Sequence, residues 1–168
     1  MNERNVLVEV QNLKKWFPVK KGLPMGEKKY VKAVDDVSFQ VFQGETLGLV
    51  GESGCGKSTL ARSILRLIEP TSGAVFYKGE DIVKKSKREM KQMRQHMQIV
   101  FQDPYGSLHP KMRIGDIIEA PLIIAHYGDK EARRKRVEEL IEMVDLKKEY
   151  LDRYPHEFSG GQRQRIVI

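Results

Sequence analysis

Nine consecutive residues in the first half of the chain have the types and the spacing that bind a phosphate chain. They fit the pattern GxxxxGK[ST], in which glycines let the backbone fold so that successive N–H groups point at phosphates. The positive end of the helix that follows adds to this attraction. Lys57 can reach the β- and γ-phosphates, Ser58 can hold Mg²⁺, and Thr59 can support the α-phosphate side. The residues of this predicted nucleotide site are Gly51, Glu52, Ser53, Gly54, Cys55, Gly56, Lys57, Ser58 and Thr59.

Cys55 occupies a free position of this loop, and we interpret it as a small loop residue. No His or Asp accompanies it in the pattern that would activate a thiol nucleophile. The histidines also lack the spacing of metal ligands. They are His96, His109, His126 and His156.

The elements that must position the loop follow in the right order. Residues 46–50 form a short apolar run of the kind that is buried in a parallel sheet, and apolar residues between 60 and 68 recur at helical spacing. The fold class predicted from this layout is an α/β core with a helical insert. Further strands are expected at 6–10, 34–41, 74–77 and 98–101, a loop at 18–29, and helices at 87–97 and within 114–153.

Composition and charge exclude several classes of protein. With 168 residues and 40% hydrophobic content the chain can bury one sizeable core. No run approaches the roughly 18 apolar residues of a membrane span, no secretory signal begins the chain, and one cysteine forms no internal disulfide, so we expect a cytoplasmic protein. The net charge is +7, but the cations gather in separate clusters beside apolar or acidic residues and form no single basic stripe with aromatic stacking residues, so no nucleic-acid partner is expected. We interpret the clusters as solvated faces, with an anionic membrane surface as the alternative.

Two more segments decide among the proteins that carry such a loop. Residues 157–165 resemble the signature motif of the ABC ATPases, with Phe158 where many members have Leu, and Gln102 resembles their Q-loop glutamine. A serine and two glycine amides at a helix N-terminus can bind a γ-phosphate. The resemblance implies that this contact is made across a dimer, on the other subunit's ATP, and that Gln102 acts catalytically with Lys57 and meets Mg²⁺ with Ser58. The signature residues are Ser159, Gly160, Gly161 and Gln162.

The resemblance narrows to the ATPases of dipeptide and oligopeptide importers. Residues 100–110 and 154–165 are similar to theirs, and residues 33–39 and 51–59 resemble the F-type of their two unlike ATPase subunits. This implies ATP and Mg²⁺ as cofactors and a second, unlike ATPase subunit as partner. Membrane permease subunits would be contacted through the helical insert and Gln102, at the cytoplasmic face of the plasma membrane.

The resemblance also implies a division of the chain and a place for adenine. Residues 1–102 would form the ATP-binding core, a P-loop NTPase with a parallel sheet and an N-terminal antiparallel β part. Residues 104–157 would form the helical subdomain, and 158–168 the signature and the start of the next helix. Aligning the first strand selects Phe17 as the ring that stacks on adenine, while Trp16 and Tyr30 stay open because stacking needs only a flat apolar face.

The chain departs from the family pattern after the signature. The Walker B strand, with its Mg²⁺-associated Asp and water-activating Glu, the D-loop and the switch histidine should follow, but Ile168 comes first. We therefore expect a fragment, incomplete at its C-terminus, that binds nucleotide poorly and hydrolyses almost none. Two other readings stay open, a soluble ABC ATPase acting on DNA or ribosomes and a complete, non-catalytic nucleotide-binding module.

Overall fold

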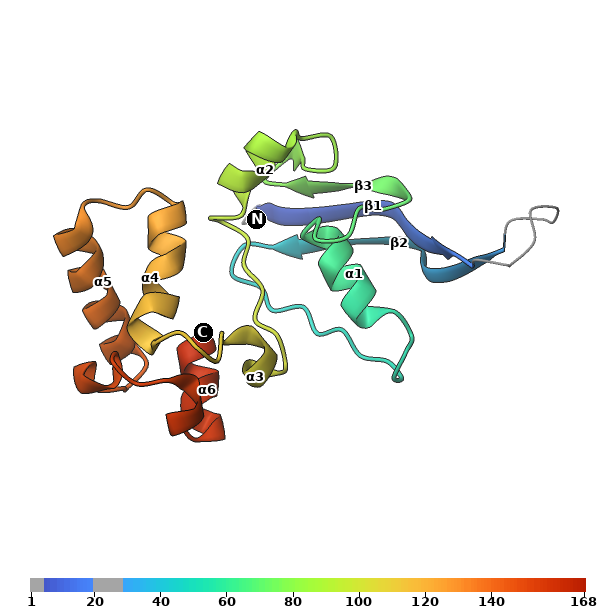
Figure 1. The fold of residues 1–168 in the computed structure, drawn as a ribbon. Helices are drawn as coiled ribbons and strands as arrows, with labels where there is room; N and C mark the ends of the chain where they lie inside the picture. Colours follow the sequence, from blue (N-terminus) through green and yellow to red (C-terminus); the bar gives the residue numbers. More distant parts are fainter. Residues whose placement is uncertain (1–4, 20–28) are drawn as a thin grey trace. The chain divides into compact units, whose positions relative to one another are not determined.

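The computed structural model describes residues 5–19 and 29–168, so most of the loop predicted at 18–29 lies outside the described residues. The chain folds into two compact units, shown as a ribbon in Figure 1. Unit 1 ends at Gln98 and unit 2 comprises Ile99–Ile168. The predicted division at 102–104 stays a prediction.

Unit 1 is built on an antiparallel sheet. Within the described residues its four strands are ordered β2-β1-β3-β4, and β1 pairs with both β2 and β3. The antiparallel β part expected near the N-terminus is thereby confirmed. The strands are β1 Val6–Pro18, β2 Tyr30–Phe42, β3 Ser72–Tyr77 and β4 Glu80–Asp81.

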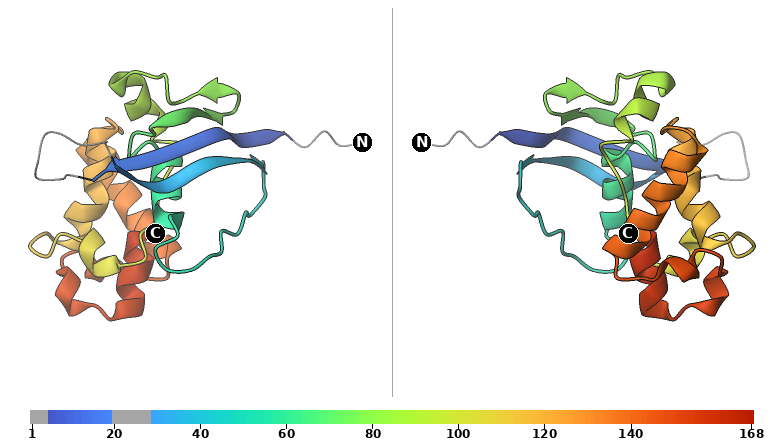
Figure 2. Two further views of the ribbon diagram at one scale, coloured as in Figure 1. Left: turned by 90° about the vertical axis from the view of Figure 1, so that its right-hand side faces the viewer. Right: turned by 90° about the vertical axis from the view of Figure 1, so that its left-hand side faces the viewer.

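Two helices complete the core of unit 1. Helix α1 spans Lys57–Ile64 and packs against β1 and β2, on one face of their ladder as the two views of Figure 2 show. Helix α2 spans Lys87–Met93 and begins at a capping box between Ser86 and Glu89. Its Met90 is buried, and Met93 packs against the same cluster, because residues three apart lie on the same side of a helix. The buried core residues are Val10, Leu13, Val34, Leu60, Val75, Ile82 and Met90.

Two strand predictions are wrong for the described residues. Neither 46–50 nor 98–101 is a strand, and the apolar side chains of the first segment face solvent, with Val50 95% exposed. A strand exists only where a neighbour completes its backbone hydrogen bonds, and none of the described strands pairs with either segment. The parallel part of the predicted sheet is therefore absent from the described structure.

Unit 2 is helical, as the pattern between 114 and 153 predicted. Its helices enclose a small core of Ile114, Ile141, Leu146 and Phe158. Helices α4 and α5 are bridged by Arg133 Nε and Glu119 Oε1 at 2.9 Å. The elements are α3 Pro104–Ser107, α4 Ile114–Ile124, α5 Lys130–Met143, the 3-10 turns η1 Lys148–Tyr150 and η2 Pro155–Glu157, and α6 Gly160–Val167.

The lengths of the helices bear on whether the chain contains a membrane-spanning segment. Among the residues that the structure describes, no helix combines the length and the apolar character needed to span a bilayer.

An ion pair beside the tryptophan gives a pH-dependent signal in unit 1. Trp16 Nε1 donates to Asp35 Oδ1 at 3.0 Å, and Lys32 lies 3.2 Å from the other carboxylate oxygen. The Lys32 hydrogen bond, opposed by desolvation and helped by Trp16, holds the pKa of Asp35 below its ordinary value. A carboxyl with a lowered folded pKa contributes stability above its unfolded pKa and loses it as the pH falls through the folded pKa.

We therefore expect the emission of Trp16, the only tryptophan, to change in acid with a midpoint below the ordinary Asp pKa of about 3.9. The measurement is a fluorescence titration, with Asp35→Asn as the control that lacks the transition. A transition centred at or above the ordinary Asp pKa of about 3.9 would contradict the geometry.

Candidate nucleotide-binding site

The phosphate loop takes a backbone path that requires glycine. Gly54 has φ 83° and Gly56 has φ 101°, in the left-handed region that other residues rarely adopt. A Cβ on Gly56 would lie only 2.0 Å from the carbonyl oxygen of Ala33 in β2. The end of the loop is therefore held against the backbone of the antiparallel sheet, and only a residue without a side chain fits.

The Lys57 ammonium lies folded back over this loop. Its Nζ donates to the carbonyl oxygens of Gly51 and Glu52, both at 2.6 Å, and lies 3.5 Å from Cys55 Sγ. Carbonyl oxygens are weaker partners for an ammonium than phosphate oxygens, because phosphate oxygens carry a negative charge and add a Coulomb attraction between opposite charges. The lysine is thus placed where an entering phosphate could replace the carbonyls.

The start of α1 offers unused backbone donors. Gly56 occupies the N-cap position and makes no side-chain cap, so the first N–H groups of the helix have neither an intrahelical nor a side-chain partner. Aligned helix N–H groups with a nearby ammonium suit a phosphate. The loop and α1 therefore fit the triphosphate that the sequence predicts, with Leu60 anchoring the helix in the core.

Ser58 is placed to supply one of the few protein oxygens that Mg²⁺ needs when it is bound together with phosphates. Its side chain is exposed at the second position of α1. Mg²⁺ usually takes one or two protein oxygens together with phosphate oxygens and water. Across residues 5–19 and 29–168 no group of three or more His, Cys, Asp or Glu side chains could hold a metal ion alone. Gln102 belongs to unit 2, and its role at the same ion stays a prediction.

The three candidate rings for adenine differ in what covers them. Trp16 is fixed by its bond to Asp35, has Lys32 Nζ 4.5 Å from its ring centroid, and lies 6.1 Å from the ring of Tyr30. Phe17 is 37% exposed, with Lys15 Nζ 4.9 Å from its centroid. Each ring has one side taken by a neighbour, and the choice of Phe17 stays a prediction.

The signature residues form a second helix N-terminus, in unit 2. Ser159 is the N-cap of α6 and shares a capping box with Gln162: its hydroxyl accepts from Gln162 N at 3.3 Å, and its own N–H donates to Gln162 Oε1 at 2.9 Å. Gly160 and Gly161 are exposed, and a Cβ on either would meet nothing within 4 Å. Their N–H groups at the first two helix positions have no intrahelical partner. The arrangement presents donors outward, as an anion site on another molecule's ligand would need.

Two neighbours hold this turn in place. Phe158 is 4% exposed in the core of unit 2 and meets Tyr150 edge-on, with 5.6 Å between ring centroids. Arg165 Nη1 donates to the carbonyl oxygens of Val144 and Asp145, at 3.2 and 3.1 Å, just beyond the end of α5. The sequence analysis missed this role of Arg165. Arg165 lies in the last turn of α6, and its closeness to the end of α5 becomes visible only in three dimensions.

Gln102 lines an open hollow of unit 2. The hollow has a volume of about 470 Å³. Gln102 is exposed there and free to meet another group. The other lining residues are Val100, Phe101, Gln164, Val167 and Ile168.

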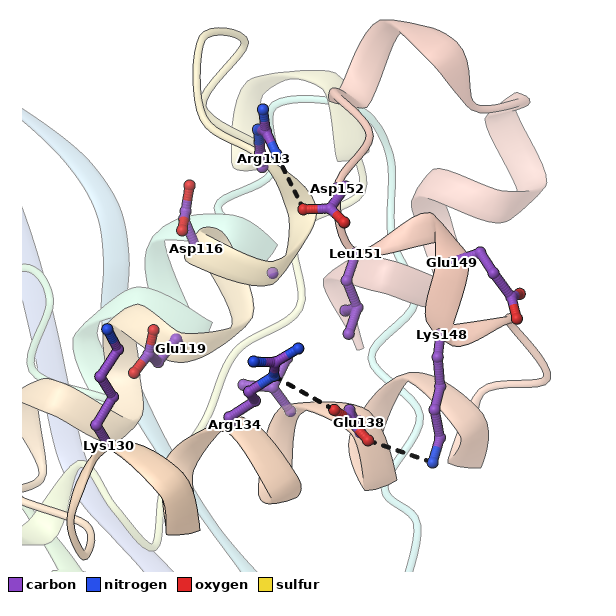
Figure 3. Close-up of a pocket in the computed structure, with 12 residues that line it drawn as sticks. Arg113, Asp116, Glu119, Lys130, Arg134, Glu138, Lys148, Glu149, Leu151 and Asp152 are labelled. Atoms are coloured by element: carbon purple, nitrogen blue, oxygen red, sulfur yellow. Dashed lines mark hydrogen bonds and ion pairs between the residues drawn. The ribbon is translucent and has the colours of Figure 1, made fainter.

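A cavity of about 540 Å³ lies among α4, α5 and η1, and contains none of the predicted site residues (Figure 3). Several of the charged side chains that line it form ion pairs with one another. Glu138 forms ion pairs with Arg134 and Lys148, at 3.6 and 3.4 Å, and Arg113 forms one with Asp152 at 2.9 Å. The lining carries both signs of charge and none of the residues of the phosphate loop, so we do not assign this cavity as the nucleotide site.

Comparison with known proteins assigns the family. The model of the ABC transporter family matches residues 34–168, so the chain belongs to this family, as its motifs predicted. Among curated proteins, it is 50% identical to the dipeptide transport ATP-binding protein DppF of Escherichia coli (strain K12) over 96% of this chain and 48% of that protein. It is 52% identical to the oligopeptide transport ATP-binding protein OppF of Bacillus subtilis (strain 168) over 96% of this chain and 52% of that protein. The chain spans about half the length of these relatives.

Solved structures confirm the predicted fold class. The dimeric structure of MJ0796, described as a bacterial ABC transporter cassette, is 31% identical with a TM-score of 0.77. The alignment covers 96% of this chain and 67% of that one. A second structure of MJ0796, in a post-hydrolysis state bound to ADP and Pi, matches equally well.

The glycines of the loop yield a matched pair of substitutions. Gly54→Ala and Gly56→Ala each force alanine into a left-handed conformation, which costs about 1–2 kcal/mol. Only at Gly56 would the new carbon also collide with the Ala33 carbonyl, since Gly54 has open space around it. We expect Gly56→Ala to lower the melting temperature further and to weaken ATP binding by about tenfold or more through displaced loop donors. Thermal unfolding and titration with a fluorescent ATP analogue test this, and equal effects of the two substitutions would contradict it.

Proposed function

We propose that the protein containing this chain is the ATP-binding subunit that energises a peptide importer. The observation that carries the proposal is the roughly 50% identity to dipeptide and oligopeptide transport ATP-binding proteins along 96% of this chain. That match spans the Q-loop segment at 100–110 and the signature segment at 154–165. The proposed location is the cytoplasmic face of the plasma membrane, beside the permease.

The phosphate loop binds the triphosphate of ATP in this proposal. Lys57 leaves the carbonyls of Gly51 and Glu52 for the β- and γ-phosphate oxygens, and the first N–H groups of α1 complete the contact. Ser58 holds Mg²⁺, which when bound neutralises charge on the phosphates. An aromatic ring of the β1–β2 ladder, Phe17 by preference, covers adenine.

The signature turn acts on a second ATPase subunit, of an unlike kind. The outward N–H groups of Gly160 and Gly161, with the Ser159 hydroxyl, bind the γ-phosphate held by that subunit. This explains why the turn is exposed although Phe158 beside it is buried. The helices of unit 2 and Gln102 contact the permease and couple the γ-phosphate and Mg²⁺ to it.

Hydrolysis of ATP also needs a group that positions the attacking water, a role that none of the residues named above is proposed to fill. Phosphoryl transfer requires a group that positions the attacking water as well as charges that stabilise the phosphate. Lys57, Ser58 and the two sets of helix N–H groups serve the second purpose. We therefore infer that residues 1–168 alone bind nucleotide weakly and turn over almost none, whereas the complete protein is an ATPase.

Lys57→Ala in the complete protein tests the proposed function directly. The substitution removes charge-assisted bonds worth about 1.5–3 kcal/mol each, so ATP affinity should fall about tenfold or more and cells should lose uptake of labelled di- and oligopeptides. Purification of the tagged wild-type protein from detergent-solubilised membranes should bring down integral membrane subunits. If no membrane subunit is retained and peptide uptake survives Lys57→Ala, the protein is a soluble ABC ATPase and the proposal fails.

Ser159 allows the capping and the phosphate-binding roles to be separated. Ser159→Ala removes the cap on Gln162 and should destabilise α6 by about 1 kcal/mol. Ser159→Asp retains an acceptor at the cap but places a negative charge against the γ-phosphate, so it should keep stability and abolish ATP-dependent association of the two ATPase subunits. Urea unfolding and size-exclusion chromatography with ATP measure the two effects. Normal association of the Asp variant would rule out the γ-phosphate contact.

A further inference from the structure

Helix α2 has one side packed in the core of unit 1 and another side covered with cations that form no ion pair among the residues the structure describes. Met90 is buried in the core and Met93 packs against it, which fixes how the helix is turned. Side chains on an α-helix are about 100° apart, so Lys87, Lys91 and Arg94 share one stripe, with Arg88 beside it. All four of these cations are exposed. We call them the α2 stripe.

The negative charges near α2 are already used elsewhere. Lys84 pairs with Asp81 at 3.0 Å and Lys85 with Glu80 at 2.6 Å, in the loop before the helix. Glu89, the only acidic residue between 84 and 97, caps the helix start by accepting from Ser86 N at 2.8 Å. It also lies about 200° round the helix from Lys87. Within the described parts of the chain, no ion pair neutralises a member of the α2 stripe.

We propose that the α2 stripe binds the headgroups of anionic lipids. Four cations on a helix of fixed orientation form a local positive surface within an already basic chain of net charge +7. Cations held near an anionic leaflet are attracted by about 1 kcal/mol each, which is about fivefold in affinity per residue. The inference rests on the proposed function only for its location, since an importer ATPase works beside a membrane.

The surroundings of the stripe favour lipid over other anionic partners. Residues 78–100 contain no Phe, Tyr or Trp, so nucleic-acid bases would find no ring to stack on. The cavities described above are lined by residues from 100 onward, and no member of the stripe borders them. An acidic peptide would therefore lack a groove for its side chains there, whereas a layer of headgroups needs only exposed charge.

The test is co-sedimentation of the complete protein, purified without its membrane subunits, with phospholipid vesicles. One set consists of phosphatidylcholine alone and the other of phosphatidylcholine and phosphatidylglycerol in equal parts. The stripe variant carries Lys87→Gln, Arg88→Gln, Lys91→Gln and Arg94→Gln. The control variant loses the same charge from α5 through Lys130→Gln, Arg134→Gln, Lys135→Gln and Arg136→Gln.

We expect binding to the anionic vesicles only, weakened at least about tenfold in the stripe variant and by high salt, and much less in the control variant. ATP binding should be unchanged in both variants, which shows that they fold. A Lys87→Arg and Lys91→Arg variant, which keeps the charge, should bind like the wild type.

Three results would overturn the proposal. Equal losses in the stripe and control variants would show that net charge alone attracts the protein. Equal binding to both kinds of vesicle would exclude headgroup charge, and binding of RNA or an acidic polypeptide without any vesicle binding would assign the stripe to another partner. Retention of permease subunits in detergent does not depend on the stripe, so failure here is distinct from failure of the proposed function.

Discussion

The contact between Gly56 and the Ala33 carbonyl fixes the geometry on which the nucleotide site depends. A phosphate loop works only if its N–H groups converge, and convergence requires that the loop end and the start of α1 be held in place. The antiparallel sheet provides that support through β2, while Leu60 fastens the helix in the same core. The sheet therefore also has a role at the site, because it fixes the position of the backbone at Lys57, where α1 begins.

The two predicted anion sites use the same helix-end physics with different chemistry. In α1 the N-cap is a glycine without a side-chain acceptor, so the first N–H groups of the helix can donate to a ligand. In α6 Ser159 and Gln162 satisfy each other, and only the two glycine N–H groups stay open. In the proposed function, the first site would therefore enclose a phosphate chain from several sides, whereas the second would offer a few donors to one phosphate on another subunit.

The sequence predicted the phosphate loop, the strands near 6–10, 34–41 and 74–77 and the helical character of unit 2, because each is encoded by residue types and spacing within one segment. The antiparallel arrangement of the strands was implied only by the family resemblance. It failed at residues 46–50, whose apolar run signals burial but cannot supply the neighbouring strand that burial needs. Strand β1 was predicted only to Val10, since polar residues and the left-handed Asn12, with φ 45°, interrupt its alternation where the register shifts. The contacts of Ala33 and Arg165 join distant segments, so no local pattern could reveal them.

The hydrogen bonds from Arg165 to the carbonyl oxygens of Val144 and Asp145 connect two parts of unit 2. They tie the signature helix to the end of α5, and the buried ring of Phe158 adds a second attachment to the same small core. The Ser159 turn and the C-terminal end of α5 are thus joined through the same few side chains. A displacement of the end of α5 would therefore be passed to the position of the turn through Arg165 and Phe158, while the capping box between Ser159 and Gln162 preserves the internal geometry of the turn.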